Sequence, residues 1–177
     1  WNEFNGSFYI GTNKVQDYAD LAVAAYDAAK AADPGAQVGL SVASSDIGFL
    51  DLAIKAGAAD HFDFICLHPY ENLDAMLYGD VAGFLGLAGA ARQMLAANRQ
   101  PVETPIWFTE GGATSTVQPD AAADAHQAEA LLKFYLASLA QGVARIFWFE
   151  ARGPDYGGGR DFGLIRKDWT LRPAYAA

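Results

Sequence analysis

Hydrophobic and polar positions follow two patterns that alternate along this chain. Apolar residues recur at helical spacing over four stretches, which predicts helices at 17–32, 47–56, 83–97 and 119–140. Short, nearly continuous apolar runs lie between and after them and predict strands at 38–43, 62–68, 105–109 and 145–150. The stretch that follows Pro69-Tyr70 has neither pattern and is expected to be a loop.

Strands that alternate with helices of this length indicate an α/β fold with a parallel sheet. Two architectures fit, a doubly wound sheet and a (β/α)8 TIM barrel. A doubly wound nucleotide-binding sheet would need a glycine-rich phosphate loop, and the glycines at 57, 111–112 and 157–159 match no such motif. The barrel is therefore favoured, and no repeat or long linker divides the chain into further domains.

Composition and charge narrow the class of partner. The net charge of −9 repels phosphate backbones, so nucleic acid is not expected as a partner. No apolar run reaches the roughly 20 residues of a membrane span, so no membrane partner is expected. The single cysteine, Cys66, excludes an intrachain disulfide and lies in an apolar stretch, where we expect a buried, unreactive thiol.

Polar and aromatic residues stand at the chain start and where the predicted strands end. In chain order they are Trp1-Asn2-Glu3, Ser44-Ser45, His68-Pro69-Tyr70, Glu110-Gly111-Gly112, Trp148 and Glu150. In a parallel βα array the carboxyl ends of the strands carry the chemistry. We therefore expect these side chains to surround one site.

Alternation along the strands gives a second expectation, because strand residues two apart share a face. The sets that should share a face are Ile106, Phe108 and Glu110; Cys66, His68 and Tyr70; and Ile146, Trp148 and Glu150. Each set runs from apolar residues inside the strand to a polar or aromatic residue at its end. This is typical of a barrel with a packed interior and a functional site at the carboxyl ends of its strands. Trp107 has the opposite parity to Glu110 and is expected to pack under the helices.

Two carboxylates at strand ends suit glycoside hydrolysis, which needs one carboxylic acid as proton donor and one carboxylate as nucleophile or base. Trp1-Asn2-Glu3-Phe4-Asn5 resembles the W-N-E-P-N motif that ends strand four in clan A, the large clan of retaining TIM-barrel glycosidases. Phe108-Thr109-Glu110-Gly111-Gly112 is similar to the strand-seven motif of the clan, and His68-Pro69-Tyr70 to its strand-six end. Trp148 resembles the strand-eight tryptophan, and the tail at 162–175 resembles the closing segment. The nearest likeness within the clan is to xylosidase/iduronidase-like and cellulase-like families.

The resemblance implies a role for each of these residues. Glu3 would be the acid/base and Glu110 the nucleophile of a retaining O-glycosidase, with the two carboxyl groups about 5–5.5 Å apart. Asn2 would bind the sugar 2-hydroxyl, and His68 and Tyr70 would orient the nucleophile or neighbouring hydroxyls. Trp148 would form the floor of the sugar subsite.

Two side chains keep alternative roles. Glu150 either binds a sugar hydroxyl or pairs with Arg152 or Arg160, and the pair is favoured. Trp169, in a polar turn, is either an exposed sugar platform or a cover of the barrel. An oligo- or polysaccharide is the expected partner. No metal-binding motif is present, and no metal or other cofactor is expected.

The resemblance runs from the end of strand four to helix eight and covers nearly the whole chain. Residues 1–177 are therefore expected to be the C-terminal portion of one TIM-barrel catalytic domain, with strands one to three and most of strand four lying outside the sequence. One departure is Phe4, where the motif usually has Pro. The sequence leaves open the sugar, exo or endo action, the oligomeric state and the compartment, secreted and periplasmic locations included.

Rival functions remain at this point. A non-catalytic carbohydrate-binding barrel or pseudoenzyme would keep Tyr70 and Trp148 but would need neither Glu3 nor Glu110. A lyase or aldolase barrel would need a Schiff-base lysine or a metal cluster at a strand end, and every lysine lies in a predicted helix or loop.

Overall fold

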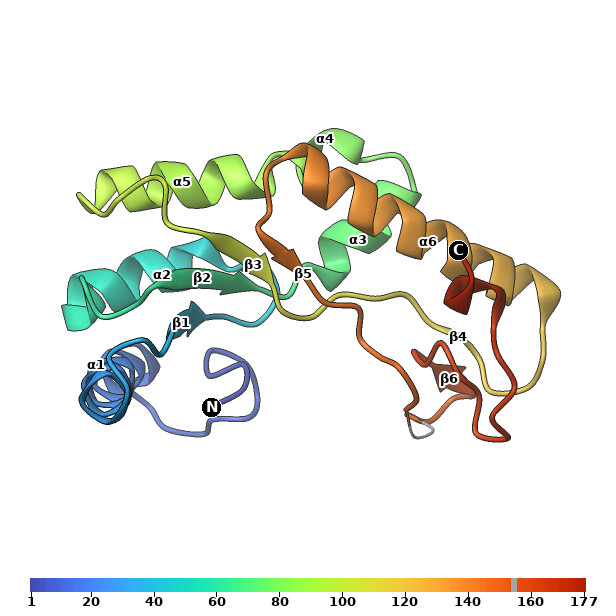
Figure 1. The fold of residues 1–177 in the computed structure, drawn as a ribbon, viewed down its shortest axis with the longest axis horizontal. Coiled ribbons are helices and arrows are strands. Elements are labelled where there is room, and N and C mark those ends of the chain that lie inside the picture. The colour runs from blue at the N-terminus through green and yellow to red at the C-terminus, as the bar shows by residue number, and fades with distance from the viewer. Residues whose placement is uncertain (154–155) are drawn as a thin grey trace.

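The chain folds around one parallel sheet (Figure 1). The computed structural model describes residues 1–153 and 156–177. The sheet has the strand order β1-β2-β3-β5. Its strands are β1 (Gly39–Ser41), β2 (Phe64–Leu67), β3 (Ile106–Phe108) and β5 (Arg145–Ile146). Neighbours along the sheet are also neighbours along the chain, and Ile65 pairs with both Leu40 and Ile106.

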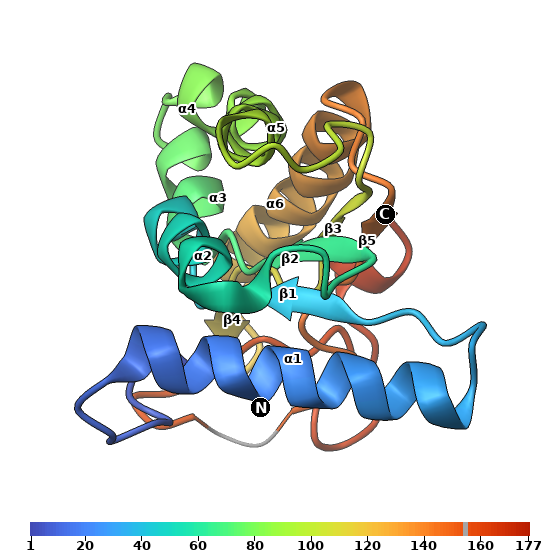
Figure 2. The ribbon, with the colours of Figure 1, turned by 90° about the vertical axis from the view of Figure 1, so that its left-hand side faces the viewer.

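One helix precedes the parallel sheet, others connect each of its strands to the next, and a short one follows the last strand. They are α1 (Lys14–Ala32), α2 (Ile47–Ala53) with the π-helix η1 (Ile54–Ala58), α3 (Tyr70–Leu77), α4 (Val81–Leu85), α5 (Leu87–Ala97), α6 (Ala121–Ala140) and the short 3-10 helix η2 (Pro173–Tyr175). Helix α1 runs below the β1 edge and packs against α2 and η1 (Figure 2). Aspartates cap three helices: Asp46, Asp80 and Asp120 accept hydrogen bonds from backbone N–H groups of the first turns.

The predicted elements differ from the observed ones in four ways. The expected loop after Pro69 is helix α3, and the single helix expected at 83–97 is broken at Gly86 into α4 and α5. The strands are shorter than their apolar runs. A two-stranded antiparallel sheet of β4 (Ser115–Thr116) and β6 (Arg160–Asp161) was not predicted, because two-residue strands carry no periodic pattern.

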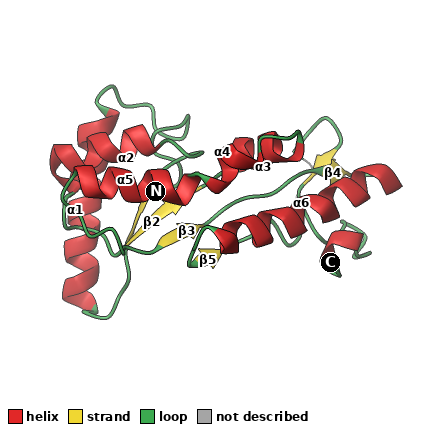
Figure 3. Cartoon of the chain, turned by 90° about the horizontal axis from the view of Figure 1, so that it is seen from above, coloured by secondary structure: helices red, strands yellow, loops and turns green. Residues whose placement is uncertain are grey.

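The buried hydrophobic residues form a core between the sheet and the helices, whose arrangement Figure 3 shows from above. Phe108 of β3 meets Phe134 of α6 with ring centroids 6.1 Å apart and Phe84 of α4 at 5.9 Å. Leu40, Val42, Ile65, Leu67 and Ile106 belong to the same buried cluster. The even-numbered residues of β3 therefore face the helices, in line with strand alternation.

The opposite face of the sheet carries a second aromatic group. Phe64 stacks on Trp107 at 3.7 Å, Phe147 lies 6.4 Å from Trp107, and the guanidinium of Arg145 sits 4.8 Å over the Trp107 ring. The expectation that Trp107 packs under the helices is therefore wrong. The alternation itself holds, but it is Phe108 and not Trp107 that occupies the helix-covered face.

A buried charged network attaches the C-terminal segment to α6. Arg172, 1% exposed, pairs with Asp124 of α6 at 3.2 Å and with Asp161 of β6 at 3.1 Å. Arg166 forms a second ion pair with Asp124, and Ser115 donates to the same carboxylate at 2.7 Å. These contacts hold the segment that follows β5 against the helix layer.

None of the helices in residues 1–153 and 156–177 has the length and apolar character needed to cross a membrane.

Candidate active site

A cavity of about 450 Å³ opens beside the carboxyl ends of the strands. Side chains from the N-terminal segment, from the loops after β1, β3 and β5 and from α3 line it. They are Asn2, Glu3, Phe8, Ala43, Ser44, Tyr70, Glu71, Glu110, Phe149 and Phe162. Of the residues expected at the site, the structure brings five to this one cavity, from positions up to more than a hundred residues apart in the chain: Asn2, Glu3, Ser44, Tyr70 and Glu110.

Glu3 is held by the two residues that follow it. Phe4 is 3% exposed and stacks on Tyr9 with centroids 3.9 Å apart, so it anchors the N-terminal segment in the core. The side chain of Asn5 accepts from the backbone N–H of Ala43 at 2.7 Å, tying this segment to the end of β1. Glu3 itself has φ of 45°, a conformation that residues other than glycine rarely adopt and that is often found at functional sites.

His68 lies below the two glutamates at the end of β2 and is 2% exposed. Its Nδ1 is 2.9 Å from Oε1 of Glu3 and 3.8 Å from Oε2 of Glu110. Its Nε2 is 3.0 Å from Oγ1 of Thr109. Both ring nitrogens therefore have partners, and the imidazole joins the candidate acid/base to the strand that carries the candidate nucleophile.

Glu110 follows β3, which ends at Phe108, and lines the cavity. The hydroxyl of Tyr70, the first residue of α3, donates to its Oε2 at 3.0 Å. Burial raises the pKa of Tyr70 well above its ordinary value, and the negative charge of Glu110 raises this pKa further. The phenol therefore stays protonated and keeps its role as donor to the carboxylate.

Glu110 does not share a face with Ile106 and Phe108, which pack against the helices. The backbone leaves the strand conformation after Phe108, so strand alternation no longer sets the direction of the Glu110 side chain. The prediction that Ile106, Phe108 and Glu110 share one face is therefore wrong for Glu110. Cys66 and His68 do lie on the same side of β2, with Thr109 beside both.

Glu3, His68 and Glu110 each offer a ligand atom, and these atoms lie within 4.8 Å of one another. Such a set of donors suits a divalent cation as well as a hydrogen-bonded pair of carboxylates. Here Nδ1 of His68 lies within hydrogen-bonding distance of Glu3, and Tyr70 donates to Glu110. These contacts favour the pair of carboxylates over a metal-binding interpretation.

Trp148 does not line the cavity. It packs against the core on the helix-covered face, with its ring 6.1 Å from Phe134, and its indole N–H has no hydrogen-bond partner among the described residues. The next residue, Phe149, lines the cavity together with Phe162. The residue that reaches the cavity from this segment is therefore Phe149 and not the expected Trp148.

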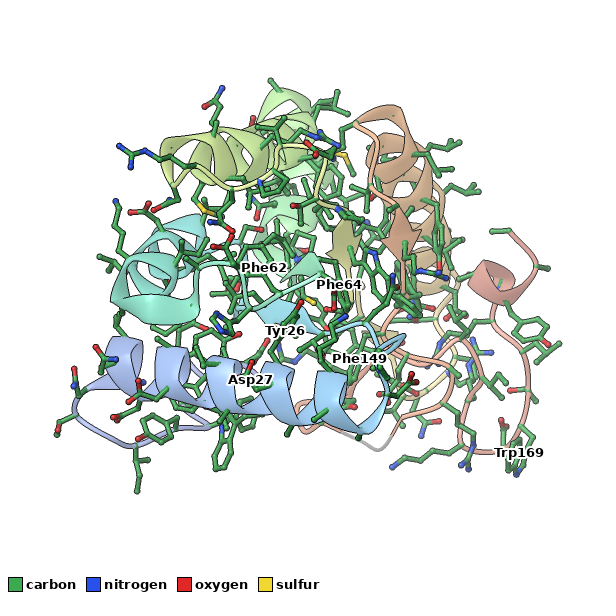
Figure 4. All side chains as sticks on the ribbon, turned by 60° about the vertical axis from the view of Figure 1, so that its left-hand side comes forward. Tyr26, Asp27, Phe62, Phe64, Phe149 and Trp169 are labelled. Atoms are coloured by element: carbon green, nitrogen blue, oxygen red, sulfur yellow. The ribbon has the colours of Figure 1, made fainter. Side chains whose placement is uncertain are left out.

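Glu150 takes neither of its expected ion-pair partners. Within the described ranges, its hydrogen-bond partner is the hydroxyl of Tyr156, whose pKa is raised to about 12 by burial and by this bond to Glu150. Arg152 instead lies 4.2 Å over the ring of Trp169. Trp169 is 69% exposed at the edge of the molecule, away from Phe149 (Figure 4), so it does not cover the barrel interior.

Several side chains at the site were not expected from the sequence. Glu71 lines the cavity and accepts from the hydroxyl of Ser44 at 2.9 Å. Phe162 enters from the segment after β6, and Thr109 contacts His68. Thr109 carried a local signal because it directly precedes Glu110, and Phe162 carried one because it begins the tail that resembles the closing segment. Glu71 belongs to a segment without a periodic pattern.

The sequence matches no model of a known protein family, and it matches no curated protein. Solved structures similar to the chain include a family 39 glycoside hydrolase from the gut symbiont Bacteroides cellulosilyticus, with a TM-score of 0.67 and 22% identity over 99% of this chain and 38% of that one. An α-L-arabinofuranosidase from Thermotoga maritima gives a TM-score of 0.66 and 16% identity, over 94% of this chain and 34% of the other.

A broad-specificity endoglucanase from Clostridium acetobutylicum gives a TM-score of 0.63 and 14% identity, over 96% of this chain and 52% of that one. The chain thus spans between a third and about half of the length of these structures. At such identities the likeness establishes the fold alone. The α/β class and the parallel sheet expected from the sequence are confirmed, and the fold is that of a part of these carbohydrate-active chains.

Proposed function

We propose that this chain carries the catalytic pair of a glycoside hydrolase that cleaves O-glycosidic bonds with retention of configuration. The observation that carries the proposal is the approach of Glu3 and Glu110, which have oxygen atoms within 4.8 Å of each other in one cavity. Retaining enzymes hold their two carboxyl groups about 5–5.5 Å apart, whereas inverting enzymes hold them about 6.5–9.5 Å apart to admit a water molecule. The similarity in fold to solved glycoside hydrolases supports the same class of reaction.

The proposed reaction has two steps. In the first, the carboxylate of Glu110 attacks the anomeric carbon while Glu3 gives its proton to the departing glycosidic oxygen, so that the bond to the leaving group breaks and a glycosyl ester forms. In the second, Glu3 takes a proton from a water molecule, whose oxygen attacks the same carbon and releases Glu110. Two displacements at one carbon restore its original configuration.

The other cavity residues would bind and orient the sugar. Asn2 is placed to bind a hydroxyl beside the reacting carbon, and Phe149 offers an aromatic face for the apolar side of the ring. Tyr70 holds the nucleophile by its hydrogen bond to Glu110. Glu150, held by Tyr156 beside Phe149, remains a candidate for a hydroxyl contact.

The superimposed structures are longer than this chain, and one face of the sheet carries exposed Phe147. We therefore take residues 1–177 to be the C-terminal portion, from the end of strand four to helix eight, of one TIM-barrel catalytic domain. In that arrangement the uncovered aromatic face of the sheet would be the barrel interior. Within clan A, we propose a xylosidase/iduronidase-like or cellulase-like family.

The test is hydrolysis of a panel of aryl glycosides by the protein and by its Glu110→Gln and Glu3→Gln variants. Glu110→Gln should abolish turnover on every substrate. Glu3→Gln should lower turnover by about 10²–10⁴-fold for poor leaving groups, because these need protonation, and by less for good ones. The matched control is Glu103→Gln, an exposed carboxylate in the turn before β3.

NMR of the first-formed product reports the anomeric configuration. Release of the inverted sugar would contradict the retaining assignment, and unchanged activity of Glu110→Gln would contradict the assigned nucleophile. A folded protein that binds saccharides but hydrolyses none would instead be a carbohydrate-binding barrel or pseudoenzyme.

A further inference from the structure

The imidazole of His68 is enclosed between two partners that restrict where its proton can lie. Nδ1 lies 2.9 Å from Oε1 of Glu3, Nε2 lies 3.0 Å from Oγ1 of Thr109, and the residue is 2% exposed. A neutral imidazole has one N–H donor and one bare acceptor nitrogen. At such a burial each of the two nitrogens needs a partner of the opposite kind.

The proposed reaction limits the choice on the Glu3 side. Glu3 must present a proton to the leaving oxygen, and this proton has to sit on the carboxyl oxygen that faces the cavity. The other oxygen, Oε1, is then an acceptor. It is satisfied when Nδ1 of His68 carries the ring proton and donates it. The opposite tautomer would draw the acidic proton of Glu3 into the bond with His68, away from the substrate.

Thr109 completes the arrangement on the other side of the ring. With the proton on Nδ1, Nε2 is bare and needs a donor, and the hydroxyl of Thr109 can donate to it. The backbone N–H of Thr109 is already used by the carbonyl of Leu67 at 3.2 Å, so the strand fixes the position of this hydroxyl.

We infer that Thr109 is a positioning residue that holds His68 as the Nδ1–H tautomer, so that the imidazole donates to Glu3 and leaves the cavity-facing oxygen of Glu3 free to carry the catalytic proton. The consequence for turnover rests on the proposed function, whereas the tautomer of His68 does not. Thr109 does not touch the sugar, and its effect passes through His68.

The experiment is a long-range ¹⁵N–¹H NMR spectrum of the histidine rings, recorded on the full chain at neutral and mildly alkaline pH. The chain has three histidines, and His61→Gln and His126→Gln variants assign the signals of His68 by elimination. The expected result is a protonated Nδ1 and a bare Nε2. A protonated Nε2 with a bare Nδ1 would overturn the inference, whatever the activity of the protein.

Three substitutions extend the test. Thr109→Val keeps the shape of the side chain and removes the hydroxyl. In this variant His68 should no longer be held in the Nδ1–H tautomer alone, and its ring signals should change accordingly. The kcat should fall by about tenfold, which is the effect of one hydrogen bond, with little change in KM. Thr109→Ser should restore both, and Thr104→Val, which removes a hydroxyl from an exposed turn, should change neither.

An unchanged His68 spectrum in folded Thr109→Val would overturn the inference. If Thr109→Val does not fold, the wild-type and Thr109→Ser spectra still decide it. A protein with the expected tautomer but no glycosidase activity would count against the proposed function and not against the positioning of His68.

Discussion

The hydroxyl of Tyr70 donates a hydrogen bond to Oε2 of Glu110 over 3.0 Å, although 40 positions separate the two residues in the chain. The contact joins the first turn of α3 to the segment after β3. It exists because parallel strands end at one edge of the sheet, where β2 and β3 release their following segments side by side. The candidate nucleophile is therefore oriented by a side chain from the neighbouring βα unit.

Tyr70→Phe tests this contact. The variant keeps the ring and removes the donor to a charged acceptor, which is worth about 1.5–3 kcal/mol, so kcat/KM should fall by about 10- to 100-fold. The measurement is steady-state hydrolysis of the best aryl glycoside, with circular dichroism as the check on folding. Tyr78→Phe, at the exposed C-terminal end of α3, is the control and should behave as wild type. Unchanged kinetics in Tyr70→Phe would show that Glu110 does not depend on this donor.

Substitution of Phe149 should change substrate binding, whereas substitution of Trp148 should change the free energy of unfolding. Phe149→Ala removes an aromatic wall of the cavity and should raise KM by about fivefold, the scale of one aromatic contact. Trp148→Phe acts on the helix-covered face and should cost about 1 kcal/mol of unfolding free energy while leaving KM unchanged. Substrate kinetics and urea unfolding of both variants separate the two effects. The reverse pattern would restore Trp148 as the sugar floor.

Arg172 should be essential for stability. Its guanidinium is shared by Asp124 and Asp161, and Arg172→Met would leave both buried carboxylates without that partner, at a cost of about 3–5 kcal/mol. The control is Lys133→Met, which breaks an exposed pair with Glu129 on α6 and should cost less than about 1 kcal/mol. Urea unfolding measures both values. Equal losses in the two variants would mean that the buried network contributes no more than a surface pair.

Cys66 should react slowly and with an unusual pH dependence. Burial raises the pKa of its thiol from 9.0 to about 12, and only the thiolate reacts with thiol reagents. At about pH 8 the folded protein should therefore be labelled some two to three orders of magnitude more slowly than the denatured chain. The rate should continue to rise beyond the pH at which the denatured chain levels off.

The same pKa difference has a consequence for stability. The unfolded chain releases the thiol proton at lower pH than the folded one, so the contribution of Cys66 to stability is present below the ordinary thiol pKa and is lost as pH rises toward 12. Because Cys66 is the single cysteine, one labelling signal reports on it without ambiguity. Fast labelling of the native protein near neutral pH would show that the thiol is accessible and ionised.

The sequence predicted the sheet and the main helices because their apolar patterns are long or uninterrupted. The alternating segments at 17–32, 119–140 and 62–68 correspond to α1, α6 and β2, with shifts of a few residues at their ends. Helix α3 was missed because its eight residues directly follow Pro69 and include Glu71, Asn72 and Asp74, which weaken the apolar pattern. Gly86 divides α4 from α5 where the sequence suggested one continuous helix.

What the sequence by itself determined is the βα order, the parallel sheet and the set of polar residues at strand ends that includes Glu3, His68 and Glu110. These features are local, because periodicity and turn residues act over a few positions. The tertiary structure decided which face each strand turns to the helices, and therefore that Phe149 and not Trp148 reaches the cavity. It also decided the partners of His68, Glu150 and Arg172, because hydrogen bonds and ion pairs between distant segments depend on packing that no local pattern records.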